Sequence, residues 1–171
     1  MAAHSLQYKN GGNVPEGVGL LISILLRYAE VGSVYYWSER QALKFTFMLR
    51  GEADIERLRN NLPLALEVYH QLEGHTMHDC EIGCRSEDKI HVLTIVRDVD
   101  SMTQNEVGLI VDFVKRECAE FLVCDEVNLP EDELQFQEEL IDHMLANIHN
   151  NVMDKNVVAV REEGRVLVFR N

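Results

Sequence analysis

Residues 75–84, "HTMHDCEIGC", form the densest group of metal-ligating and nucleophilic side chains in the sequence. The segment holds two histidines, an aspartate and two of the four cysteines of the chain. Imidazole and thiolate groups are the usual ligands of zinc, and a thiolate is also a nucleophile. The residue types therefore raise two hypotheses, a metal site and a reactive thiol.

The predicted local structure makes most forms of a metal site and of a reactive thiol unfavourable in this segment. The pattern predicts a strand over residues 77–85, with His78, Cys80, Ile82 and Cys84 on the face that is turned to the core. Four residues of strand separate the two cysteines by about 13 Å, too far for a disulfide or for a shared zinc ion. His78 with Cys80 remains as a local metal-binding pair. The neighbouring acidic residues disfavour a thiolate.

Glu139 and His143 form a second candidate pair, one turn apart on a predicted helix. Such a pair can hold a divalent ion or transfer protons. The alternative hypothesis is therefore a small metal-dependent enzyme or metal-binding protein that uses His78 with Cys80, or Glu139 with His143. The purely structural interpretation is that the cysteines pack in the fold and that Glu139 and His143 lie on a solvated helix face. It predicts no cofactor and no metal, and it identifies no catalytic residue.

The sequence contains no motif of the common phosphate-binding, serine-hydrolase or zinc-protease types. The aromatic run Tyr35–Trp37 could stack on a flat ligand, which gives a further hypothesis of a small-ligand binder. Alternation along a strand would instead place one or two of these rings in the core. The ligand itself is not identified by the sequence.

Charge and hydropathy indicate which partners to expect. The net charge of −13 repels nucleic acid and anionic lipid. The most apolar stretch, residues 17–32, is interrupted by Arg27 and Glu30 and is shorter than a membrane span. With no secretory signal at the start, we expect a cytoplasmic protein with reduced thiols and no membrane or nucleic-acid partner.

The order of elements predicts an α+β fold: a largely antiparallel sheet of about six strands, in three hairpins, with about four helices packed on it. We expect an N-terminal tail over residues 1–12 and one domain over 13–171. A helix followed by a hairpin occurs three times, which allows an internal α-β-β repeat, but convergence of hairpin turns and amphipathic helices is the favoured explanation of the likeness. The expected helices span 13–31, 52–72, 103–122 and 131–151, and the hairpin turns lie at 38–41, 86–88 and 162–164.

Four local signals refine these elements. Gly32 should end the first helix, and Pro63 should kink the second helix or divide it into two. Thr103 with Glu106 should form a capping box at the start of the third helix. The final hairpin, apolar at nearly every position, should be covered on both faces.

The predicted first helix is apolar all round over residues 18–28. Such a helix lies either at the centre of the core or in an interface with a second subunit. The second possibility leads to our main functional hypothesis. We expect a non-enzymatic binding or regulatory domain that self-associates, as a homodimer, through this helix.

Overall fold

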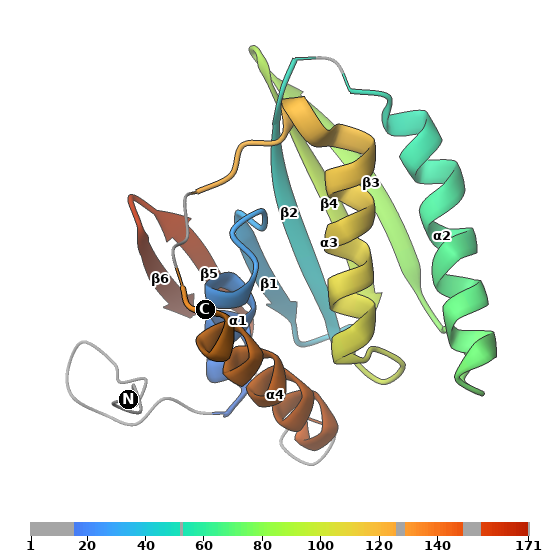
Figure 1. The fold of residues 1–171 in the computed structure, drawn as a ribbon, viewed down its shortest axis with the longest axis vertical. Coiled ribbons are helices and arrows are strands. Elements are labelled where there is room, and N and C mark those ends of the chain that lie inside the picture. Colours follow the sequence, from blue (N-terminus) through green and yellow to red (C-terminus); the bar gives the residue numbers. More distant parts are fainter. Residues whose placement is uncertain (1–15, 52, 126–128, 149–154, 171) are drawn as a thin grey trace.

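The computed structural model describes residues 16–51, 53–125, 129–148 and 155–170 (Figure 1). These residues form an α+β fold with a six-stranded antiparallel sheet, which confirms the predicted class. The elements are α1 (Glu16–Arg27), β1 (Ser33–Trp37), β2 (Ala42–Arg50), α2 (Ile55–Leu72), β3 (Cys80–Glu87), β4 (Ile90–Asp98), α3 (Gln104–Cys118), a short 3-10 helix (Ala119–Phe121), α4 (Glu131–Asn147), β5 (Val157–Glu162) and β6 (Arg165–Arg170).

The sheet is built from three hairpins in the order β3-β4-β2-β1-β5-β6. The first hairpin, β1 with β2, lies at the centre. The second hairpin joins it through β4 and β2, and the third joins through β5 and β1. Every pairing is antiparallel, and the two edges of the sheet are β3 and β6.

The four helices lie over one face of this sheet (Figure 1). The face beneath them carries the buried side chains of alternate strand positions, such as Val34, Phe45, Ile95 and Ala159, which join helix residues in one core cluster. No described helix covers the other face, whose residues are mostly half-buried. An antiparallel sheet tolerates this arrangement because its strands can be apolar on one side and polar on the other.

The first helix ends at Arg27, earlier than predicted, and Gly32 does not terminate it. Gly32 instead donates its N–H to the carbonyl oxygen of Thr46 at 2.8 Å, at the entry to β1. The carbonyl groups at the end of α1 are satisfied by the Arg161 side chain of β5, which donates to the backbone oxygens of Leu25, Tyr28 and Val31. A cation at a helix C-terminus is also favoured by the helix dipole.

Pro63 lies inside a single helix, so of the two predicted alternatives the division into two short helices is wrong, and the kink stays a prediction. Asp54 begins α2 by accepting a hydrogen bond from the N–H of Arg57 at 3.2 Å. Leu58, Leu62 and Leu66 form its buried face.

The hairpins differ from the prediction at their limits. β3 begins at Cys80, so residues 77–79 are outside the strand, and its turn lies at Asp88–Lys89, slightly later than expected. The last hairpin is covered on one face only, because no described helix lies over its other face, where Phe169 remains 56% exposed. The predicted cover on both faces is therefore wrong.

Three helix–hairpin units do follow one another, with α3 outside this order. Whether they arose by duplication stays a prediction. The predicted tail, 1–12, and the first three residues of the predicted helix 13–31 lie outside the described residues.

Candidate functional site

The most unusual feature of the core is a buried ion pair between β4 and α3. Arg97 and Glu106 are both fully buried. The guanidinium donates from Nε to Oε2 of Glu106 at 2.8 Å and from Nη2 to Oε1 at 2.7 Å. This bidentate geometry is the strongest form of the arginine–carboxylate interaction, and it offsets part of the cost of burying the two charges.

Four further residues surround the pair: His70, Asp79, Asp98 and Ser101. The other guanidinium nitrogen of Arg97 donates to the Asp98 carboxylate and to the backbone oxygen of Asp79. His70, at the C-terminal end of α2, brings its Nε2 atom against Glu106 Oε1. Ser101 links the loop after β4 to Asp98 through its hydroxyl and its N–H. The network therefore fastens α2, α3 and the adjoining ends of β3 and β4 together.

The Asp98 carboxylate is held ionised by this network. Burial favours the neutral acid, but hydrogen bonds from Ser101 and from the Asp79 N–H, with the charge of Arg97, outweigh burial and lower the pKa of Asp98 to about 2. The carboxylates likewise outweigh burial at Arg97 and raise its pKa. Both groups remain charged throughout the physiological range.

Only half of the predicted capping box between Thr103 and Glu106 is present. Thr103 does begin α3, because its Oγ1 atom accepts from the N–H of Glu106 at 3.2 Å. The Glu106 side chain, however, points into the network with Arg97 and His70 instead of returning to the Thr103 N–H. A buried arginine offers a carboxylate a stronger hydrogen bond than a backbone N–H does.

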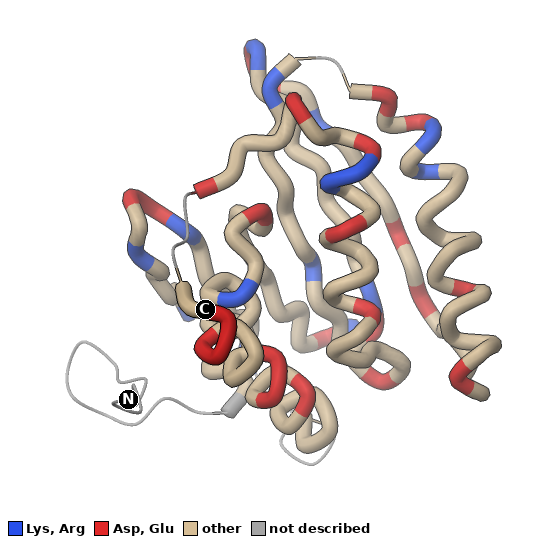
Figure 2. The backbone as a smooth tube through the Cα atoms, in the orientation of Figure 1, with Lys and Arg blue, Asp and Glu red and all other residues tan. Residues whose placement is uncertain are grey.

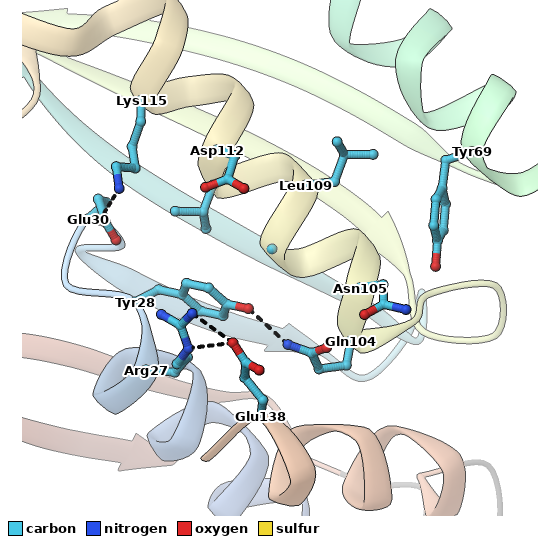
Figure 3. A pocket seen from close by; sticks show the side chains of 12 residues that line it. Arg27, Tyr28, Glu30, Tyr69, Gln104, Asn105, Leu109, Asp112, Lys115 and Glu138 are labelled. Atoms are coloured by element: carbon cyan, nitrogen blue, oxygen red, sulfur yellow. Dashed lines mark hydrogen bonds and ion pairs between the residues drawn. The ribbon is translucent and has the colours of Figure 1, made fainter. Parts of the chain in front are cut away.

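A groove of about 460 Å³ lies beside this network, between α3 and the α1–α4 pair (Figure 3). Several of its polar side chains pair with one another, either within the α1–α4 wall or across the groove to α3. Arg27 of α1 binds Glu138 of α4 at 2.7 Å, and Lys115 of α3 binds Glu30 at 3.3 Å. Gln104 donates to the Tyr28 hydroxyl at 3.0 Å.

Gly108 allows the Tyr28 hydroxyl to approach α3 closely. A Cβ atom at Gly108 would lie 3.3 Å from that oxygen. Burial, as the largest of several effects, raises the pKa of Tyr28 to about 12. The phenol is therefore a hydrogen-bonding group and not a general base near neutral pH.

The first predicted pair, His78 with Cys80, does not share a face. His78 precedes β3 and its side chain is 61% exposed. Cys80 lies on the inner face of β3 opposite Arg97, with Ile82 and Cys84 on the same face as predicted. Burial raises the pKa of the Cys80 thiol to about 11, so the thiol is unreactive at neutral pH.

The second predicted pair, Glu139 with His143, lies on the exposed side of α4. The His143 ring pairs with the Asn147 side chain at 3.1 Å. Among the described residues, no three His, Cys, Asp or Glu side chains gather closely enough to hold a metal ion. All four cysteines are free.

The aromatic run is divided between the two faces of the sheet. Tyr36 is buried under the helices, while Tyr35 and Trp37 lie on the face without helices. The interpretation that one of the rings belongs to the core is confirmed. No described helix is long and apolar enough to cross a bilayer.

Sequence reasoning did not find the network of His70, Arg97, Asp98 and Glu106. Arg97 does carry a signal, since it follows the strongly apolar run of β4 on the inward-facing alternation of Leu93 and Ile95. A charge at an inward position indicates a buried partner. The partners come from two helices, so their identity required the fold.

Comparison with protein-family models, with curated proteins and with solved structures finds no match for this chain.

Proposed function

We propose that the protein is a non-enzymatic binding or regulatory domain that self-associates, and that α2 provides the contact between copies. One observation carries the proposal: Leu64, Val68 and Leu72 are 60%, 54% and 82% exposed. Their spacing of four residues places them on one stripe of the helix. Adjacent large apolar side chains in this arrangement are characteristic of a protein contact.

The stripe replaces α1 as the expected contact surface. The apolar residues of α1 are covered within one chain, since Leu20, Leu21, Ile24 and Leu25 are fully buried. This packing accounts for the all-round apolar pattern of residues 18–28. A second subunit is not needed to cover that helix.

The stripe is also self-complementary. Two α2 helices related by a two-fold axis at Val68 run antiparallel, and Leu64 of one copy then meets Leu72 of the other. Exposed Asn60, Asn61 and Gln71 border the stripe. An apolar centre with a polar rim is the usual composition of an interface.

Charge favours α2 over the other helices. Residues 55–72 carry two arginines and two glutamates and are formally neutral, whereas the whole chain carries −13. Residues 131–147 of α4 contain six acidic residues and no lysine or arginine (Figure 2). Two copies that meet through α2 therefore avoid the strongest like-charge repulsion.

The raised pKa values and the ion pairing of the candidate reactive groups support a binding function over a catalytic one. The Cys80 thiol and the Tyr28 phenol both have raised pKa values, and four charged residues of the groove form two ion pairs, Arg27 with Glu138 and Lys115 with Glu30. The free cysteines and the acidic surface support the expectation of a cytoplasmic protein that does not bind nucleic acid.

Sedimentation velocity over a range of protein concentrations tests the proposal. We expect a reversible dimer, and we expect Val68→Glu to weaken it at least tenfold because a charge is placed at the two-fold axis. Val68 is exposed, so the folded state should change by no more than about 0.5 kcal/mol.

Phe136→Glu provides the matched control, because Phe136 is an exposed large apolar residue of α4, at 39%. It should leave the dimer unchanged. A wild-type protein that sediments as a monomer at every concentration would refute self-association. A dimer that Val68→Glu leaves intact would refute α2 as its contact.

A further inference from the structure

The face of the sheet without helices contains a hollow of about 520 Å³ that extends across the sheet from β3 to β5. Strand register explains how it forms. Gly83, Thr94, Thr46 and Ser33 are successive cross-strand partners, so four small residues make a continuous row across four strands. Larger side chains on the adjoining rows, including Tyr35 and Lys44, rise around that floor.

Gly83 is necessary for the depth of the hollow. A Cβ atom at this position would lie 3.0 Å from the Thr94 hydroxyl oxygen, closer than a normal contact. Its backbone does not have a positive φ, so conformation does not explain the glycine. The absent side chain instead leaves space over the floor.

The charge of the hollow is opposite to that of the protein. Its lining contains Lys44 and Arg85, and none of the described residues that line it is acidic. Ser33, Tyr35, Thr46 and Thr94 add hydroxyl groups. In a chain with a net charge of −13, this is a local concentration of cations and hydrogen-bond donors.

Both cations can interact with a ligand. The Lys44 Nζ atom lies 5.1 Å from the centroid of the Tyr35 ring, which holds it over the hollow. Arg85 pairs with Glu87 at 3.2 Å, but both side chains are about two-thirds exposed. A surface pair of this kind contributes little and can be exchanged for a ligand at small cost.

The two cations lie at diagonally opposite corners of the hollow. Arg85 and Lys44 are two strands apart, about 10 Å, and their rows differ by four residues, about 13 Å. Their backbones are thus about 16 Å apart, and both side chains are long enough to reach inward. The hydroxyl groups of Thr46 and Thr94 lie between them.

We propose that this hollow binds a small organic dianion with an anionic group, carboxylate or phosphate, at each end. One end pairs with the Lys44 ammonium and the other with the Arg85 guanidinium, which can bind carboxylate or phosphate with two parallel hydrogen bonds. The Ser33 and Thr46 hydroxyls on the floor donate to the oxygens of the ligand, whereas the Thr94 hydroxyl donates to the Gly83 carbonyl oxygen at 3.4 Å. The site is on the opposite side of the sheet from α2, so it does not depend on self-association.

Isothermal titration calorimetry with two probes tests the assignment: glutarate as a dicarboxylate and inorganic pyrophosphate as a phosphate. Saturable binding of one or both is expected, and the preferred probe identifies the anionic group. Trp37, the single tryptophan, lies on the same face two residues from Tyr35 and provides a second readout by fluorescence.

Lys44→Gln and Arg85→Gln should each weaken binding about tenfold or more, because each removes one charge-assisted contact. Gly83→Val should abolish binding by filling the hollow, with circular dichroism to verify the fold. Arg116→Gln is the control, since Arg116 is an exposed cation of α3 in the helical layer.

Three results would overturn the assignment. One is the absence of saturable binding with both probes. Another is equal binding of glutaramide, the neutral diamide of glutarate. The third is an unchanged affinity in both Lys44→Gln and Arg85→Gln, which would place the anion elsewhere even if Gly83→Val fails to fold.

Discussion

At the scale of single residues, Asp98 should make the free energy of unfolding decrease at acidic pH. Its pKa of about 2 lies below the value of about 3.9 for an unfolded aspartate. A carboxylate with a lowered pKa contributes stability above the unfolded pKa, and that contribution is lost as the pH falls toward the folded pKa. The difference corresponds to about 2 kcal/mol, which should disappear between about pH 4 and pH 2.

Asp98→Asn should remove this part of the pH dependence. We expect the free energy of unfolding of the variant to fall by about 2 kcal/mol less than that of the wild type between about pH 5 and pH 2. Urea titrations at several pH values measure the difference. Parallel pH profiles for the two proteins would contradict the role given to Asp98.

At the scale of elements, the Arg97–Glu106 pair fastens β4 to α3. Replacing one partner leaves a buried charge without compensation, so Arg97→Met or Glu106→Leu should lower the free energy of unfolding by about 3–5 kcal/mol. The double variant Arg97→Met with Glu106→Leu should recover at least half of that loss. Urea unfolding of the two single variants and the double variant gives the coupling.

Additive losses in the double variant would show that the two charges act independently. A single variant that loses less than about 1 kcal/mol would show that the pair is already solvated.

Local patterns predicted the elements that depend on neighbouring residues. The alternation in β2, the apolar stripe of α3 and the cap at Thr103 are all properties of a few consecutive residues. The predictions that were wrong concern contacts between residues distant in the chain. α1 ends where Arg161 reaches its carbonyl groups, 130 or more positions away, and Glu106 leaves its expected partner for Arg97.

The features of the candidate sites also separate into those that follow from neighbouring residues and those that need partners distant in the chain. The common face of Cys80 and Cys84 followed from strand alternation, although Cys84 is exposed and Cys80 only half-buried, while His78 was misplaced because β3 begins at residue 80. The small-residue row of the hollow takes one residue from each of four strands. No linear pattern represents such a row, since it exists only after the strands are in register.

At the scale of the whole molecule, the excess of acidic residues should oppose association between two copies of the chain. Each copy carries −13, and the proposed α2 contact is apolar. Repulsion between two such copies extends over about 30 Å at 0.01 M salt and about 8 Å at 0.15 M. Added salt therefore weakens the repulsion and leaves the apolar contact in place.

We expect the dissociation constant of the dimer to decrease several-fold between about 0.01 M and 0.15 M sodium chloride. Sedimentation at matched protein concentrations measures the change, and sodium sulfate at equal ionic strength serves as a control for the anion. A dissociation constant that increases with salt would mean that ion pairs hold the dimer, and not the stripe of Leu64, Val68 and Leu72.

The position of β1 between β2 and β5 has a consequence for synthesis. The inner edge of β1 is paired only by residues 157–160, and α1 packs against α4 and β5. During translation, the first helix and the central hairpin emerge well before the segments that cover them. We therefore expect ribosome-bound chains that lack the β5–β6 hairpin to expose an aromatic strand edge and to need chaperone protection until residues 157–170 have emerged.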